Sequence, residues 1–173
     1  MSDSLHRRGI LLGVAALGLG GAPRAARAAD LVQTAKDSGS FKQLVRAIEL
    51  AGLAPALAGE GPFTLFAPTD EAFFKLPKAA LDDILQPHNR AKLDKLLRHH
   101  VLAGLVVSRD YAGKRLEAIP LAGEALLLDA RTQPRIGPAR IVRSDILADN
   151  GVIHVIDTVL IPSFDDVAAP AAR

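Results

Sequence analysis

The sequence predicts an α+β domain, and three observations lead to that fold class. Apolar residues recur at helical spacing over residues 30–58, whereas from residue 114 onward they form short runs typical of strands. A single apolar run at 63–67 predicts one early strand within the mainly helical first half. Helices therefore come mainly first and strands mainly last, and the repeated strand–helix–strand alternation of a parallel sheet is missing.

Residues 1–28 are expected to be a secretory signal peptide rather than part of the domain. Arg7 and Arg8 precede an apolar run at 9–22, and small residues follow at 26–28. The run is shorter than the roughly 20 residues that a bilayer span requires. The arginine pair also resembles a twin-arginine signal, so both export routes stay open. Either route predicts a periplasmic or secreted protein.

Charge and cysteine content narrow the classes of partner. The chain has 21 Lys+Arg and 19 Asp+Glu, and residues 1–28 contain four of the arginines and one of the aspartates. The remaining 17 basic and 18 acidic residues give no reason to expect nucleic-acid binding. There is no cysteine, so disulfides cannot stabilise the protein, and no second long apolar run predicts a membrane span. We expect a monomer that is not membrane-spanning.

Two helices are predicted before the early strand. The first begins near residue 30 and the second follows Ser40, a candidate N-cap, and ends at Gly52. Their apolar faces are formed by Leu31, Val32, Ala35, Leu44, Val45, Ile48 and Ala51.

The early strand leads into a second set of helices. Pro68 ends the strand and Thr69 is a good N-cap, with Asp70 and Glu71 in the first turn, where carboxylates oppose the positive helix end. Further helices are predicted at 79–85 and 90–99.

Short strands separated by Gly and Pro fill most of the second half. Asp149-Asn150-Gly151 is a strong turn signal. The last strand is predicted over 152–161, and residues 163–173, rich in Ala and Pro, are predicted to be a flexible tail.

Three segments together resemble the fasciclin domain family. They are FTLFAPTDEAF at 63–73, LLRHHVLAG at 96–104 and DNGVIHVIDTVLIP at 149–162. The resemblance spans about 31–162 and implies a domain at 29–162. It also implies a compact twisted β-sandwich or wedge with helices packed along one side. One departure is His99, because the family often has a tyrosine before the histidine that His100 matches.

The motif residues are interpreted as structural. Thr69 and Asp70 fit a helix start, and His100 is expected to be buried with its ring bonded to the backbone or to one of those two residues. His154 is expected to be a semi-exposed residue of the last strand. A ligand or catalytic role for either histidine is the alternative.

No pattern predicts an enzyme. There is no Gly-x-Ser-x-Gly elbow, phosphate loop or dinucleotide fingerprint, and the histidines lack metal-ligand spacing. We therefore expect a protein with no catalytic residues, no cofactor and no metal.

The resemblance and the export signal instead imply a binding module. Cell adhesion, or interaction with an extracellular or envelope protein or polysaccharide, is the leading hypothesis. In animal relatives an Asp-Ile pair before the last strand belongs to integrin-binding motifs, and Asp145-Ile146 matches that position, which suggests an exposed loop. The alternative for this pair is a strand end with Ile146 and Leu147 buried. The alternative function is binding of an apolar small ligand such as a carotenoid, which some fasciclin-like proteins carry.

Overall fold

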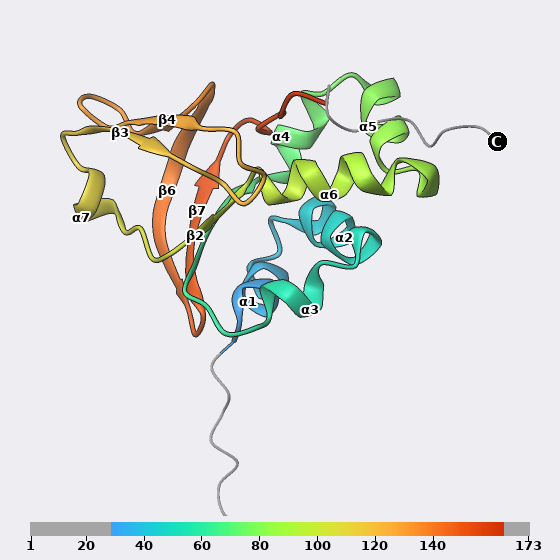
Figure 1. Ribbon diagram of the computed structural model, residues 1–173, viewed down its shortest axis with the longest axis horizontal. Helices are drawn as coiled ribbons and strands as arrows, with labels where there is room; N and C mark the ends of the chain where they lie inside the picture. The colour runs from blue at the N-terminus through green and yellow to red at the C-terminus, as the bar shows by residue number, and fades with distance from the viewer. Residues whose placement is uncertain (1–28, 165–173) are drawn as a thin grey trace, which may run out of the picture.

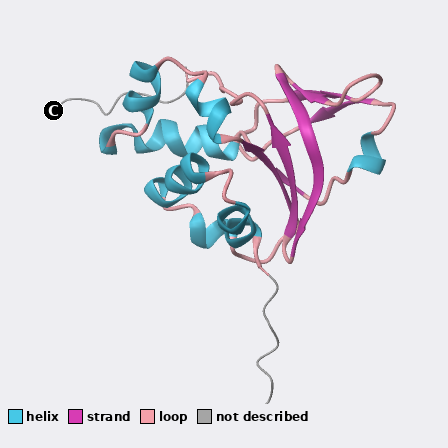
Figure 2. Cartoon of the chain, turned by 180° about the vertical axis from the view of Figure 1, so that it is seen from behind, coloured by secondary structure: helices cyan, strands magenta, loops and turns pink. Residues whose placement is uncertain are grey.

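A computed structural model describes residues 29–164 (Figure 1). The signal peptide expected at 1–28 and residues 165–173 of the expected tail lie outside the described residues. Most helices gather on one side of the molecule and the strands on the other (Figure 2). The helices are α1 Leu31–Ser38, α2 Lys42–Ala51, α3 Ala54–Leu57, α4 Asp70–Phe74, α5 Lys78–Ile84, η1 Pro87–Asn89, α6 Arg90–Arg98 and α7 Ser108–Tyr111. The strands are β1 Phe63–Pro68, β2 Val101–Ala103, β3 Arg115–Ala118, β4 Leu126–Asp129, β5 Arg135–Ile136, β6 Ala139–Ala148 and β7 Gly151–Ile156.

The strands form one mixed sheet in the order β2-β1-β7-β6-β5-β4-β3. β1 and β7 run parallel, while the other neighbouring pairs are antiparallel. The ten-residue strand β6 belongs to both halves of the sheet, and it contains register shifts between Ile141 and Ile146. The α+β fold class predicted from the sequence is confirmed, with helices mostly first and strands mostly last.

Two apolar clusters form the core. Ile153 and Val155 of β7 belong to a cluster between the sheet and the helices, to which α1, α2 and α6 contribute. Ile156 belongs to a second cluster together with Phe66 of β1 and Leu128 of β4. The second cluster therefore draws its side chains from both halves of the sheet. Because successive residues of a strand face opposite sides, β7 has apolar surroundings on both faces.

Capping residues recognised in the sequence predict several helix ends correctly. Thr69 caps α4, its hydroxyl accepting a hydrogen bond from the Ala72 N–H at 3.3 Å. Gly52 ends α2 with a left-handed φ of 73°, which glycine adopts without steric cost. The cap expected from Ser40 is wrong. The N-cap position is Phe41, and the carboxylate of Asp70 accepts the hydrogen bond of the Gln43 N–H at 2.8 Å from 27 residues away.

The end of the domain also differs from the prediction. β7 stops at Ile156 rather than at Ile161, although Val159 and Leu160 remain buried. Ser163, assigned to the tail, donates hydrogen bonds from its N–H and hydroxyl to Glu124. Phe164 packs against the cluster beneath the helices. The contacts of the domain thus continue to residue 164. Within residues 29–164, no helix is both long and apolar enough to cross a bilayer.

Candidate partner-binding surface

His154 lies at the centre of the sheet and is fully buried, contrary to the semi-exposed position expected for it. Its ring stacks on Phe66, with centroids 5.5 Å apart, and meets the edge of Tyr111 at 5.6 Å. The expectation was wrong because strand alternation says which residues share a face, but not whether both faces are covered. Here β7 lies between β1 and β6.

Both ring nitrogens of His154 have backbone partners. The Asp145 N–H donates to Nδ1 at 3.3 Å, so Nε2 carries the proton and donates to the Val106 carbonyl at 2.7 Å. Burial lowers the pKa of His154, which keeps the ring neutral at physiological pH. The ring therefore joins β7, β6 and the segment before α7.

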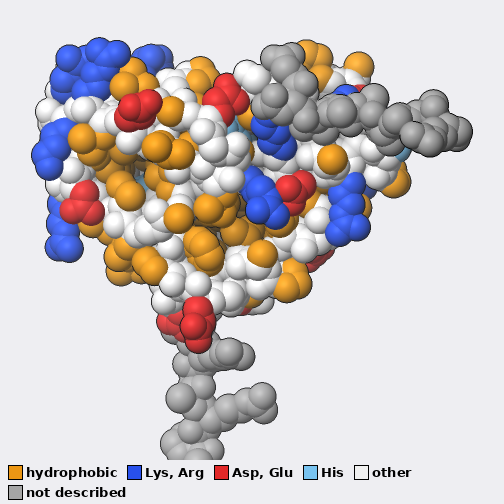
Figure 3. Space-filling model, viewed as in Figure 1, with side chains coloured by type: hydrophobic (Ala, Val, Ile, Leu, Met, Phe, Trp, Pro, Cys, Tyr) orange, Lys and Arg blue, Asp and Glu red, His pale blue; other side chains and the backbone are white. Residues whose placement is uncertain are grey.

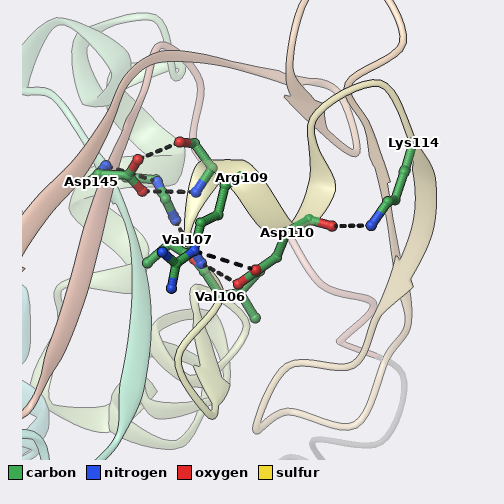
Figure 4. A network of polar contacts seen from close by, with 8 residues as sticks. Val106, Val107, Arg109, Asp110, Lys114 and Asp145 are labelled. Carbon is green, nitrogen blue, oxygen red and sulfur yellow. Dashed lines mark hydrogen bonds and ion pairs between the residues drawn. The ribbon is translucent and has the colours of Figure 1, made fainter.

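Asp145 lies inside β6, at an irregularity, and has a φ of 61°. Its carboxylate accepts hydrogen bonds from the N–H of Ser108, at 2.8 Å, and from the Ser108 hydroxyl (Figure 4). Burial acts to raise the pKa of Asp145, but these hydrogen bonds leave it below its usual value. Asp145 thus holds the start of α7 against β6.

Ser108, Asp145 and His154 have the side chains of a hydrolase catalytic triad, but the hydrogen bonds between them differ from those of a triad. In a triad the histidine ring accepts the serine proton and the aspartate orients the ring. Here the Ser108 hydroxyl bonds the carboxylate directly, and the His154 ring bonds only backbone groups. The three residues form a structural junction between α7, β6 and β7, and neither nitrogen of His154 is free to act as a base.

The expectation of an exposed loop at Asp145-Ile146 is wrong. Ile146 pairs with Ile153 and packs against the cluster beneath the helices. Its neighbour Leu147 points the other way and is 70% exposed, so the alternative that buried both residues is wrong for Leu147. Asp145 is exposed, but its carboxylate is engaged by Ser108, so the exposed apolar side chain of residues 145–147 is Leu147.

Leu147 shares an open hollow with Leu105, which is 51% exposed. The hollow has a volume of about 770 Å³ at the end of the sheet where β6 turns into β7. We call it the Leu105–Leu147 surface; it is lined by Asp30, Ala58, Gly59, Glu60, Gly61, Pro62, Leu105, Leu147, Ala148, Asp149, Asn150 and Gly151. Sequence reasoning did not find this surface, because Leu105 and Leu147 lie 42 positions apart in the chain and no local pattern connects them.

His100 is also buried, with 1% of its surface exposed. The Leu160 N–H donates to Nε2 at 2.9 Å, so Nδ1 carries the proton and donates to the Leu96 carbonyl at 2.7 Å. Burial lowers its pKa to about 4. Its partners are backbone groups, whereas Thr69 and Asp70 are engaged in the helix caps described above.

The described residues offer little to a metal ion. Between residues 29 and 164, no three His, Cys, Asp or Glu side chains converge into a possible metal site. His99 is 2% exposed, and its Nδ1 has no hydrogen-bond partner among these residues. Burial lowers the pKa of His99 as well.

Comparisons with known proteins identify the fold. The fasciclin domain family model matches residues 39–162. Protein sll1483 from Synechocystis sp. is 40% identical over 133 residues, which cover 76% of this chain and 73% of that protein. Porcine transforming growth factor-beta-induced protein ig-h3 is 36% identical over 128 residues, covering 73% of this chain but 18% of the larger protein.

A solved structure agrees with these sequence matches. A FAS1 domain pair from the insect cell adhesion molecule fasciclin I superposes with a TM-score of 0.63 at 16% identity, covering 81% of this chain and 53% of that one. At that identity the likeness concerns the fold alone. The family model and the match to protein sll1483 show that the chain belongs to the fasciclin domain family.

Proposed function

We propose that this protein is an exported, non-enzymatic adhesion module that binds a protein partner in the cell envelope or outside the cell. The family membership and the adhesion role of fasciclin I support this function. The export signal expected at residues 1–28 would deliver the domain to the periplasm or the exterior.

The exposure of Leu147 and Leu105 carries the proposal. Two leucines that are 70% and 51% exposed line the same hollow, and an apolar centre of this kind is what protein interfaces bury. Asp30, Glu60 and Asp149 also line the hollow and would supply the polar rim of such an interface.

The backbone behind this surface is held from several directions. The side-chain amide of Asn150 donates to the carbonyls of Leu57 and Gly59, at 2.7 and 2.9 Å, and its oxygen accepts from the Leu31 N–H at 2.9 Å. A surface held in this way loses little conformational freedom when it binds, which favours affinity.

The test is a Leu147→Asp variant compared with Phe74→Asp. Phe74 on α4 is 68% exposed, so the control removes an equally exposed apolar side chain outside the hollow. We expect Leu147→Asp to lose capture of envelope proteins and adhesion to cells, and Phe74→Asp to retain both, with equal thermal melting of the two variants. Adhesion that survives in Leu147→Asp would remove this surface from consideration.

An apolar small ligand such as a carotenoid is the second candidate. The volume of the hollow falls within the range of about 300–1,000 Å³ that is typical of ligand sites. Purification from a pigment-producing host followed by a visible spectrum tests it. A colourless protein that takes up no pigment on mixing would contradict this candidate.

A further inference from the structure

Three arginines and one aspartate line up across the outer face of the sheet formed by β3 to β6. Strand register places Arg115, Asp129, Arg135 and Arg140 directly opposite one another on β3, β4, β5 and β6. Directly opposed residues share a face, and the neighbours Leu128, Ile136 and Ala139 face inward to the second cluster. The four side chains therefore form one row across four strands, which we call the arginine row. Basic side chains gather over this part of the molecule in Figure 3.

The single carboxylate in the row is already occupied. Arg131, just beyond β4, donates to both oxygens of Asp129, at 3.0 and 2.6 Å. These hydrogen bonds, helped by the charge of Arg115, lower the pKa of Asp129 to about 2, so the carboxylate stays ionised and paired with Arg131. Among residues 29–164, no carboxylate forms an ion pair with Arg115, Arg135 or Arg140. Asp157 borders the row: its carboxylate accepts a hydrogen bond from the Arg140 N–H at 2.9 Å and interacts with the charge of Arg140. The three guanidinium groups, which form no ion pair among residues 29–164, can still donate to an external anion.

Arg135 and Arg140 are a like-charged cross-strand pair. Two like charges directly opposite each other destabilise a sheet, and a protein that keeps such a pair often does so for a functional reason. A bound anion would turn the repulsion into attraction. Both residues are arginines, as is every basic residue from 115 to 143, and a guanidinium suits two-point binding of carboxylate or sulfate better than an ammonium does.

We propose that the arginine row binds an acidic polysaccharide through its carboxylate or sulfate groups. Neighbouring strands lie about 4.8 Å apart, so the row spans roughly 14 Å, which suits an extended polyanion better than a single small ion. Glu117, opposite Leu127 in the adjacent row, adds one negative charge beside it.

Two other polyanions fit less well. Nucleic acids that bind on sheets stack their bases on aromatic side chains, and the sequence from 115 to 148 contains no Phe, Tyr or Trp. Membrane surfaces are bound by cations together with a broad apolar face, whereas the strands here add only Leu127 and Val142, 40% and 58% exposed, to the face of the row. The inference does not depend on the Leu105–Leu147 surface.

The test measures binding of the purified protein to polygalacturonate and to dextran sulfate, with neutral dextran, single-stranded DNA and phosphatidylglycerol vesicles as comparison probes. We expect binding to an acidic polysaccharide that weakens as salt rises. Arg135→Gln with Arg140→Gln should weaken it about tenfold, because two charge-assisted contacts are lost. Arg135→Lys with Arg140→Lys should give an intermediate affinity, because charge remains but the two-point geometry is lost.

The matched control is Lys42→Gln with Arg46→Gln, which removes the same charge from two exposed positions of α2. If its affinity lies within about threefold of that of the Arg135/Arg140→Gln variant, net charge explains the binding and the proposal fails. Absence of binding to both acidic polysaccharides at low salt, or tighter binding to DNA or vesicles, overturns it as well. Leu147→Asp should bind polysaccharide normally, so failure here and failure of the adhesion surface can be told apart.

Discussion

Acidification should weaken the fold through His100, and the structure sets the size of the effect. The ring is buried between the Leu96 carbonyl and the Leu160 N–H. A second ring proton would meet the Leu160 N–H donor to donor. The folded-state pKa of His100 is lowered from 6.5 to about 4, so between these pH values the unfolded chain binds more protons. His100 therefore contributes full stability above pH 6.5, and about 3 kcal/mol of it is lost as the pH falls to 4.

Urea denaturation from pH 7 to pH 4 measures this loss, and a His100→Gln variant isolates it from other titrating groups. Glutamine can donate to the Leu96 carbonyl and accept from the Leu160 N–H without titrating. We expect the stability advantage of the unsubstituted protein over His100→Gln to shrink by about 3 kcal/mol over this range. Parallel profiles for the two proteins would refute the buried, neutral ring.

Substitutions at four further positions test separate parts of the structure. Asp145→Ala should lower the unfolding free energy by about 1–2 kcal/mol, because α7 loses its cap and alanine tolerates the left-handed backbone poorly; Asp145→Asn should cost less in the same urea titration. Gly151→Ala should cost about 3 kcal/mol, since its Cβ would lie 2.1 Å from the Phe63 carbonyl oxygen. Gly113→Ala, with a φ of 71° but open space around it, should cost about 1 kcal/mol, and equal melting temperatures for the two alanine variants would contradict this contrast. His99→Phe removes a buried nitrogen without a partner among the described residues, so calorimetry should show unchanged or higher stability, and a clear loss would reveal a partner for that nitrogen.

The sequence predicts those structural features that depend on residues close together in the chain. The cap of α4 at Thr69, the glycine that ends α2 and the buried strand β1 follow from residue type and local spacing, and all are present. The cap of α2 could not be found in this way. Its acceptor, Asp70, lies 27 residues along the chain and reaches Gln43 only after α4 has docked.

The candidate site was harder to predict for the same reason. Asp145 and His154 were singled out separately, but their connection through one hydrogen bond requires β6 and β7 to pair around an irregular register. Their link to Ser108 and Val106 joins residues 37 and 48 positions apart. The exposure of Leu147 has a different cause. Leu147 lies opposite Val152 and shares a face with Ile141, but the second cluster covers only Ile141, and strand alternation does not say how far a face is covered.

The three segments that resemble the fasciclin family, 63–73, 96–104 and 149–162, all stabilise the backbone of other parts of the chain. Each supplies a polar side chain that satisfies the backbone of a segment outside its own: Asp70 for Gln43, His100 for Leu160 in the last of the three segments, and Asn150 for Leu31. Such buried or half-buried partners are costly to lose, so substitutions there act first on folding. Leu105, Leu147 and the arginine row lie outside these segments and bear little on stability. Relatives can therefore keep the hydrogen bonds that stabilise the fold while their residues at both surfaces differ. A relative that binds a different partner would need to change only those surface residues.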